Sequence, residues 1–228
     1  MFTYLVINIG ALLIPFLFSF EGKLKFYRKW KRLFPAIFIT MAVFIPWDIL
    51  FTEKGIWGFN SHYITGVRLM GLPIEEWLFF FTIPYACLFT YEAVKYYFSG
   101  DILRKYSRGF SAVLIIILIS VAIAYHDKIY TLVTFSALAV FILFLHFFLR
   151  VNYLAKFYLS WFLVLPPFFI INGVLTGSFL HEPVVWYNNA ENLGIRLFTI
   201  PVEDLFYGML LLMLNVAIYE RQSRRIKL

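Results

Sequence analysis

Seven long apolar segments constrain the fold of this chain more than any other feature. A membrane span needs about 20 apolar residues, because the hydrocarbon core is about 30 Å thick and a helix rises about 1.5 Å per residue. Helix is the expected form, because these segments are apolar on all sides whereas barrel strands alternate polar and apolar residues. The sequence therefore predicts an all-α integral membrane protein with about seven transmembrane helices, at residues 2–20, 33–51, 74–97, 110–125, 129–149, 157–175 and 198–219.

The composition agrees with a chain that faces lipid. Hydrophobic residues make up 62% and charged residues 14%, against about 45–50% and about a quarter in soluble domains. The first segment lacks a basic region before it and a small-x-small cleavage pattern after it, so we expect a retained helix rather than a signal peptide. No long linker or soluble domain stands out, which places the expected function inside the bilayer.

The positions of Lys and Arg predict the orientation, because basic loops near helix ends stay cytoplasmic. The predicted outer side carries only Lys54, Arg68, Lys128 and Arg196. We therefore expect a multi-pass protein of the cytoplasmic membrane with the N-terminus outside and the C-terminus inside. The net charge of +7 then reflects topology and contact with anionic lipid rather than nucleic-acid binding. The other sixteen basic residues are Lys23, Lys25, Arg28, Lys29, Lys31, Arg32, Lys95, Arg104, Lys105, Arg108, Arg150, Lys156, Arg221, Arg224, Arg225 and Lys227.

An internal repeat is visible at an offset of 128 residues, without a gap over more than thirty positions. Further upstream the offset becomes 124. This predicts two parallel three-helix repeats, residues 1–98 and 129–228, joined by a linker helix at residues 99–128, with a pseudo-axis along the membrane normal. The pairs are Phe59 with Tyr187, Gly66 with Gly194, Arg68 with Arg196, Pro73 with Pro201, Glu75 with Glu203, Glu76 with Asp204, Tyr91-Glu92 with Tyr219-Glu220 and, upstream, Asp48 with Asn172 and Thr52 with Thr176.

Each repeat carries one acidic motif at the start of a predicted helix, at residues 73–76 and 201–204. Proline and carboxylates both favour the first turn of a helix, which is a purely structural explanation. Two copies, each preceded five residues earlier by Arg68 or Arg196, favour a functional site instead, because ionisable groups at membrane depth are costly and usually face a cavity or a partner.

The two acids of one motif cannot point the same way, because successive helix residues are about 100° apart. We expect one acid of each motif to cap the helix or bind arginine while the other reaches a cavity. Carboxyls that converge there repel one another, which favours retention of a proton and hence a general acid. Asp48 is a further candidate inside a span, and its counterpart Asn172 is neutral. That asymmetry could separate proton donor from acceptor, although a hydrogen-bonded structural Asp is the alternative.

Other chemistry has less support in the sequence. Aromatic residues reach 21%, and their ring faces can stabilise a cation where water is absent. No nucleotide-binding or dinucleotide-binding fingerprint occurs, so no cofactor is predicted. The single cysteine, Cys87, and the four histidines have no metal-site spacing, so no metal is predicted.

The two motifs, GLPIEEWLFF at residues 71–80 and IPVEDLFYG at residues 200–208, resemble those of the heterodimer-type, flavin-independent carotenoid (lycopene) cyclases in their fused form. The resemblance implies an intramolecular lyase or isomerase of carotenoid biosynthesis. It would close the ψ ends of lycopene to β rings, through γ-carotene to β-carotene, by redox-neutral acid catalysis. Implied partners are a lipid-soluble carotenoid, membrane lipid and other carotenoid-pathway enzymes.

Site residues carried over from the resemblance are, first, Glu75 and Glu203, with Glu76 and Asp204 beside them. Asp48 is a supporting acid. The identities of the proton donor and the base stay open. Arg68 and Arg196 are expected to tune or orient the acids, and Asn172, the neutral counterpart of Asp48, is a further supporting residue.

Three other functions have to be compared with this one. A cyclase acting on C50 carotenoids or making other ring types fits the same residues. A transporter would also explain duplicated carboxyls at membrane depth. A retinal protein is disfavoured, because residues 198–219 contain no lysine for a Schiff base.

Overall fold

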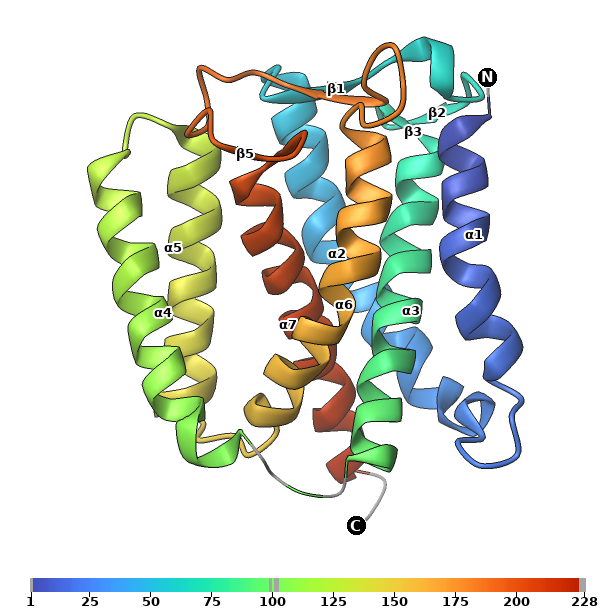
Figure 1. Cartoon of the computed structure of the whole chain (residues 1–228), viewed down its shortest axis with the longest axis vertical. Coiled ribbons are helices and arrows are strands. Elements are labelled where there is room, and N and C mark those ends of the chain that lie inside the picture. Colours follow the sequence, from blue (N-terminus) through green and yellow to red (C-terminus); the bar gives the residue numbers. More distant parts are fainter. Residues whose placement is uncertain (1, 99, 101–102, 226–228) are drawn as a thin grey trace.

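The computed structural model describes residues 2–98, 100 and 103–225, and in these residues seven α-helices form one bundle (Figure 1). A 3₁₀ turn, η1 (Phe26–Lys29), leads into α2, and a π-helix, η3 (Phe144–Phe148), continues α5. The helices are α1 (Thr3–Phe18), α2 (Trp30–Glu53), α3 (Ile74–Tyr97), α4 (Arg104–Ala124), α5 (Ile129–Leu143), α6 (Leu154–Leu175) and α7 (Val202–Arg225).

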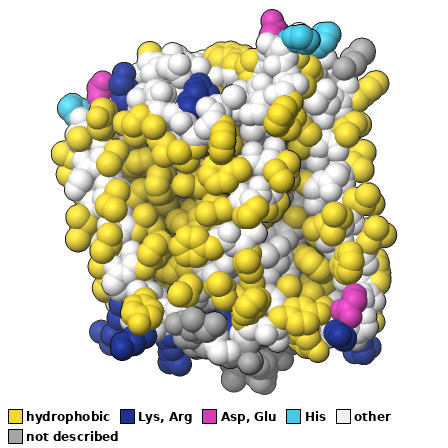
Figure 2. All heavy atoms as spheres, in the orientation of Figure 1, with side chains coloured by type: hydrophobic (Ala, Val, Ile, Leu, Met, Phe, Trp, Pro, Cys, Tyr) yellow, Lys and Arg dark blue, Asp and Glu magenta, His cyan; other side chains and the backbone are white. Residues whose placement is uncertain are grey.

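The all-α membrane fold is confirmed. Six helices in the described part of the chain are long and apolar enough to cross a membrane, and α1 is shorter, at 16 residues. Figure 2 shows hydrophobic side chains over the middle of one face, with Lys and Arg gathered mainly at the end where α1 and α3 finish. Two predicted boundaries were wrong: α4 begins before residue 110, and α7 begins after residue 198 because a short strand precedes it.

Helices from one half of the chain pack against helices from the other half. α1 packs on α3, and α5 packs on α7, so each of these contacts lies within one predicted repeat. α2 also packs against α7, while α6 packs against α3. The second helix of each half therefore supports the motif helix of the other. The division into domains stays a prediction, and its boundary residue 99, like Lys227 of the predicted cytoplasmic tail, lies outside the described residues.

Three small two-stranded sheets cover the end of the bundle where the motif helices begin. β1 (Trp57–Phe59) pairs antiparallel with β4 (Val185–Tyr187), which joins the two long loops at this end of the bundle. Within this sheet Gly58 faces Trp186, and a Cβ at position 58 would lie 2.4 Å from the indole ring, so the absence of a side chain lets the ring approach the backbone. The other two sheets are β2 (Arg68–Leu69) with β3 (Leu72–Pro73), and β5 (Arg196–Leu197) with β6 (Ile200–Pro201).

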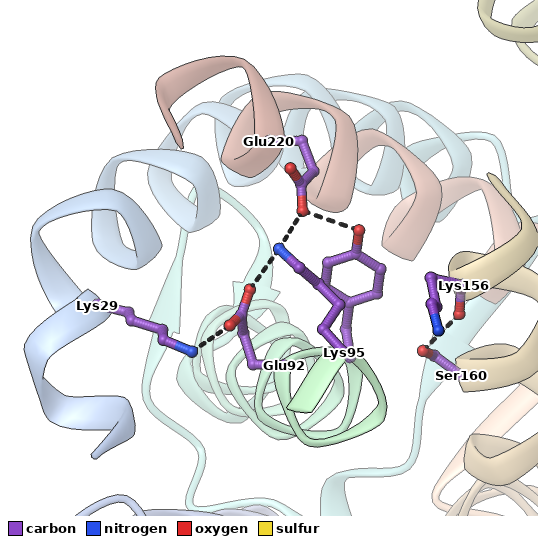
Figure 3. Close-up of polar contacts among 7 residues, drawn as sticks. Lys29, Glu92, Lys95, Lys156, Ser160 and Glu220 are labelled. Atoms are coloured by element: carbon purple, nitrogen blue, oxygen red, sulfur yellow. Dashed lines mark hydrogen bonds and ion pairs between the residues drawn. The ribbon is translucent and has the colours of Figure 1, made fainter. Parts of the chain in front are cut away.

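A charged network ties the opposite end of the bundle together (Figure 3). The buried carboxylate of Glu92 pairs with Lys29 and, at 2.9 Å, with Lys95. Lys95 also pairs with Glu220 at 2.6 Å, and the hydroxyl of Tyr91 donates to Glu220 at 2.8 Å. The network links η1, α3 and α7. The duplicated Tyr-Glu pairs contribute to it, because one pair lies near the end of α3 and the other near the end of α7.

Candidate active site

Each acidic motif follows a tight hairpin, and the arginine five residues before the proline belongs to that hairpin. Arg68 pairs with Pro73 across β2 and β3, and its Nη1 donates to the carbonyl of Gly71 at 2.8 Å. Arg196 pairs with Pro201 in the same way, and its Nη1 donates to the carbonyl of Thr199 at 2.6 Å. Among the described residues no ion pair joins either arginine to a motif acid. The arginines therefore fix the entry of the helix rather than bind the acids.

The first acid of each motif holds the loop that precedes it. Glu75 Oε1 accepts the backbone N–H of Thr65 at 2.6 Å, and Glu203 Oε1 accepts the backbone N–H of Leu193 at 2.8 Å. Both donors lie ten residues before their acid. The hydroxyl of Thr131 adds a 2.6 Å bond to Glu203. Glu75 and Glu203 are completely buried, so the acids favoured by the sequence serve as anchors for the loops that cover the bundle.

The second acid of each motif faces a cavity, as the 100° offset between neighbouring helix residues requires. Glu76 accepts a hydrogen bond from the hydroxyl of Tyr4. Asp204 accepts two, from Tyr130 at 2.6 Å and from Tyr187 at 2.8 Å. Burial and the neighbouring Asp204 carboxyl raise the pKa of Tyr187 well above its usual value, so Tyr187 stays protonated as a donor.

Asp48 reaches the same cavity from α2. Its Oδ1 accepts the indole N–H of Trp57 at 2.5 Å, and Glu76 has both Asp48 and Asp204 as electrostatic neighbours. The pseudo-equivalent Asn172 also lines the cavity, but its Nδ2 donates to the carbonyl of Phe168 within α6. Three carboxyls from α2, α3 and α7 therefore meet at one place, with a neutral amide on the facing wall.

The cavity has a volume of about 560 Å³ and lies between α1, α3, α6 and α7. Known ligand pockets enclose about 300–1,000 Å³. Glu76, Asp204 and Asp48 line it, whereas Glu75 and Glu203 do not. The structure thus brings part of the predicted site together. The second motif acids, Asp48 and Asn172 line one cavity, whereas the first acids and both arginines are outside its lining.

Aromatic rings enclose the carboxyl end of the cavity in matched positions. Phe59 and Phe79 line the cavity, and so do their counterparts at an offset of 128, Tyr187 and Tyr207. The ring of Tyr207 packs edge-on against the stacked rings of Phe44 and Trp47, with 5.2 Å between its centroid and each of theirs. Its buried hydroxyl has no partner in the described structure. The second half of the chain therefore supplies hydroxyls where the first half supplies plain rings.

Four tyrosines at this site escaped the sequence analysis: Tyr4, Tyr130, Tyr187 and Tyr207. The repeat offered a signal for two of them, because Phe59 pairs with Tyr187 and Phe79 with Tyr207 at the offset of 128. Tyr4 and Tyr130 reach their acids from positions 72 and 74 residues away, which no local pattern reveals.

Metal binding has no visible site in this geometry. Within residues 2–98, 100 and 103–225, no three His, Cys, Asp or Glu side chains are placed to hold a metal ion. That the protein needs no cofactor stays a prediction.

Comparison with known proteins identifies the family. A family model described as lycopene cyclase matches residues 1–94 and 127–221, so the chain belongs to this family. A bifunctional lycopene cyclase/phytoene synthase from Pyrenophora tritici-repentis is 44% identical over 45 residues, which cover 20% of this chain and 8% of that protein. The chain thus spans only a small part of the curated relative that it matches. No solved structure matches.

Proposed function

We propose that this member of the lycopene cyclase family closes the ψ end groups of lycopene to β rings, forming γ-carotene and then β-carotene. The reaction is acid-catalysed and redox-neutral. One observation carries the proposal: Asp48, Glu76 and Asp204 converge at one end of a mostly apolar cavity inside the helix bundle, and aromatic rings surround them.

The chemistry needs one proton delivered and one removed. A carboxylic acid protonates the terminal double bond, which gives a tertiary carbocation. The electron pair of a neighbouring double bond attacks this cation, so a carbon–carbon bond closes the ring and the positive charge moves onto the ring. A base then removes a ring proton, which forms the product alkene. No electrons enter or leave, and the net proton count is unchanged.

The hydrogen bonds favour different roles for the two cavity-facing motif acids. Asp204 receives two hydroxyl donors, which stabilise a carboxylate anion. A carbocation is so strong a carbon acid that even a well-stabilised carboxylate can deprotonate it, so we assign Asp204 as the base. Glu76 receives one hydroxyl donor and has two carboxyl neighbours, Asp48 and Asp204, so a proton held there relieves repulsion between like charges. We assign Glu76 as the proton donor.

The surrounding rings suit the cationic intermediates. Ring faces attract a cation, by about 2 kcal/mol or more where water is excluded. Tyr207 lies among all three carboxyls and touches the aromatic cluster around Trp47. A dry cavity also prevents water from capturing the cation. The sheet formed by β1 and β4 contributes Trp57, Phe59, Val185 and Tyr187 to the cavity wall and so helps to exclude water.

We also propose that the carboxyl end of the cavity faces the outer side of the cytoplasmic membrane. The support is that Lys and Arg gather mainly at the opposite end of the bundle (Figure 2), which the distribution of basic loops assigns to the cytoplasm. A reporter fused to the C-terminus should then signal from the cytoplasm. An extracytoplasmic signal would reverse this orientation.

The deciding experiment is expression in a bacterium that accumulates lycopene, followed by pigment chromatography. We expect γ-carotene and β-carotene to replace lycopene. Membranes that contain the protein, supplied with unlabelled lycopene in D₂O buffer, should add one deuterium per closed ring, because each ring takes up one solvent proton. Unchanged lycopene in cells that contain well-folded protein would overturn the proposal, and rings of another type or activity only on C50 substrates would redirect it within the family.

A further inference from the structure

The cavity extends far beyond the three carboxyls. Its lining on α3 runs as one stripe from Glu76 to Thr90, which corresponds to about 21 Å along the helix axis. On α6 it runs from Leu175 to Trp161, a similar length. The acids lie at one end only, and small or apolar side chains such as Ala86 form much of the remaining wall. A site for protonation alone would not need this length.

The extension opens sideways rather than toward either end of the bundle. Two lining residues are strongly exposed, Ile14 on α1 at 63% and Ile170 on α6 at 68%, whereas Glu76 is only 8% exposed. Gly10 on α1 and Pro167 on α6 are lining residues that are exposed as well. The mouth therefore lies between α1 and α6, on the apolar surface that faces lipid.

The wall formed by α6 is irregular at this mouth. Pro166 and Pro167 lie inside the helix, and each removes a backbone hydrogen bond and bends the helix. Figure 1 shows the bend in α6. α1, on the other side of the mouth, packs chiefly on α3 and makes few contacts with α6. The two walls of the opening are thus held mainly by other helices.

We propose that this extension binds the unreacted chain of a long linear hydrocarbon, which enters from the lipid between α1 and α6 with one end group leading toward the carboxyls. This inference rests on the proposed function and adds the binding site of the substrate chain and its route of entry. An apolar chain gains about 25 cal/mol for each Å² of surface buried. Because the acids occupy one end only, the two ends of a chain must react one after the other.

A bulky side chain placed in the extension tests this proposal directly. Ala86 lies about 15 Å along α3 from Glu76, so Ala86→Phe should block the chain while leaving the carboxyls untouched. We expect conversion of lycopene to fall at least about tenfold, while a short acyclic terpene with the same end group reacts as in the unsubstituted protein. The matched control is Ala93→Phe, the same change on the same face of α3 but beyond the cavity lining, which should convert lycopene normally.

The outcomes separate the two proposals. If the unsubstituted protein converts lycopene and Ala86→Phe does so equally well, the chain site is overturned while the proposed function stands. If the unsubstituted protein converts nothing, the proposed function fails first.

A second measurement does not depend on turnover or on the folding of the Ala86→Phe variant. Cys87, the single cysteine, lines the extension. In a Glu76→Gln protein, lycopene should slow the labelling of Cys87 by a lipid-soluble maleimide at least about threefold, whereas the short terpene should not. Equal labelling with and without lycopene would contradict a chain bound along α3.

Discussion

The hydroxyl of Tyr187 donates a 2.8 Å hydrogen bond to Oδ2 of Asp204, and the position that corresponds to Tyr187 in the other half of the chain is Phe59. Glu76 therefore lacks the second hydroxyl donor that Asp204 has. This difference between two otherwise matched acids is the basis for assigning one as base and the other as donor.

Replacement of Tyr187 by Phe should lower kcat about 10- to 100-fold. The lost hydrogen bond to a charged acceptor is worth about 1.5–3 kcal/mol, and each 1.36 kcal/mol corresponds to about tenfold. Tyr63→Phe, a buried tyrosine of the outer loop that does not line the cavity, is the control. Turnover by membranes of both variants, normalised to folded protein, provides the measurement. An unchanged kcat for Tyr187→Phe would remove this tyrosine from the mechanism.

Amide substitutions should rank the four motif acids. Glu76→Gln and Asp204→Asn should each lower turnover at least about 100-fold, as expected when a general acid or base is lost. Glu75→Gln and Glu203→Gln should lower it less, because the amide oxygen can still accept the loop N–H. Pigment analysis at equal levels of folded protein distinguishes the pairs. The reverse ranking would return the proton-transfer roles to Glu75 and Glu203, as the sequence favoured.

Asp48→Asn tests the third carboxyl with little structural disturbance. The asparagine oxygen can still accept the indole N–H of Trp57, and the matching position on α6 already holds Asn172. We expect turnover to fall about 10- to 100-fold while the thermal unfolding midpoint in detergent changes little. Full activity would show that Asp48 is a structural hydrogen-bond acceptor.

The charged network at the far end should affect stability rather than chemistry. Glu92→Gln leaves Lys29 and Lys95 without their shared carboxylate, and we expect the free energy of unfolding to fall by about 1–3 kcal/mol, since the pair partners are only partly buried. Glu53→Gln, at an exposed helix end, is the control. Thermal unfolding gives the stability, and turnover per folded molecule should be unchanged. Equal midpoints for the two variants would contradict this role.

Much of the fold and part of the site follow from sequence alone. Apolar length predicts the membrane-spanning helices because lipid accepts only a backbone that satisfies its own hydrogen bonds. The repeat predicts matched local structure: Ile74 donates its backbone N–H to Val67, and Val202 does the same to Ile195, at 2.9 and 3.0 Å. The motif acids and Asp48 could be named because charged groups are rare inside apolar segments.

Only the tertiary structure decided which acids face the cavity and what surrounds them. The 100° offset required neighbouring acids to diverge, but the rotation of α3 and α7 against their neighbours selected Glu76 and Asp204. The tyrosines that donate to these acids come from helices and loops distant in sequence, and the exchange of α2 and α6 between the halves brings Asp48 beside Glu76 and Asp204. Local patterns encode helix and hairpin, whereas such convergence depends on how whole helices pack.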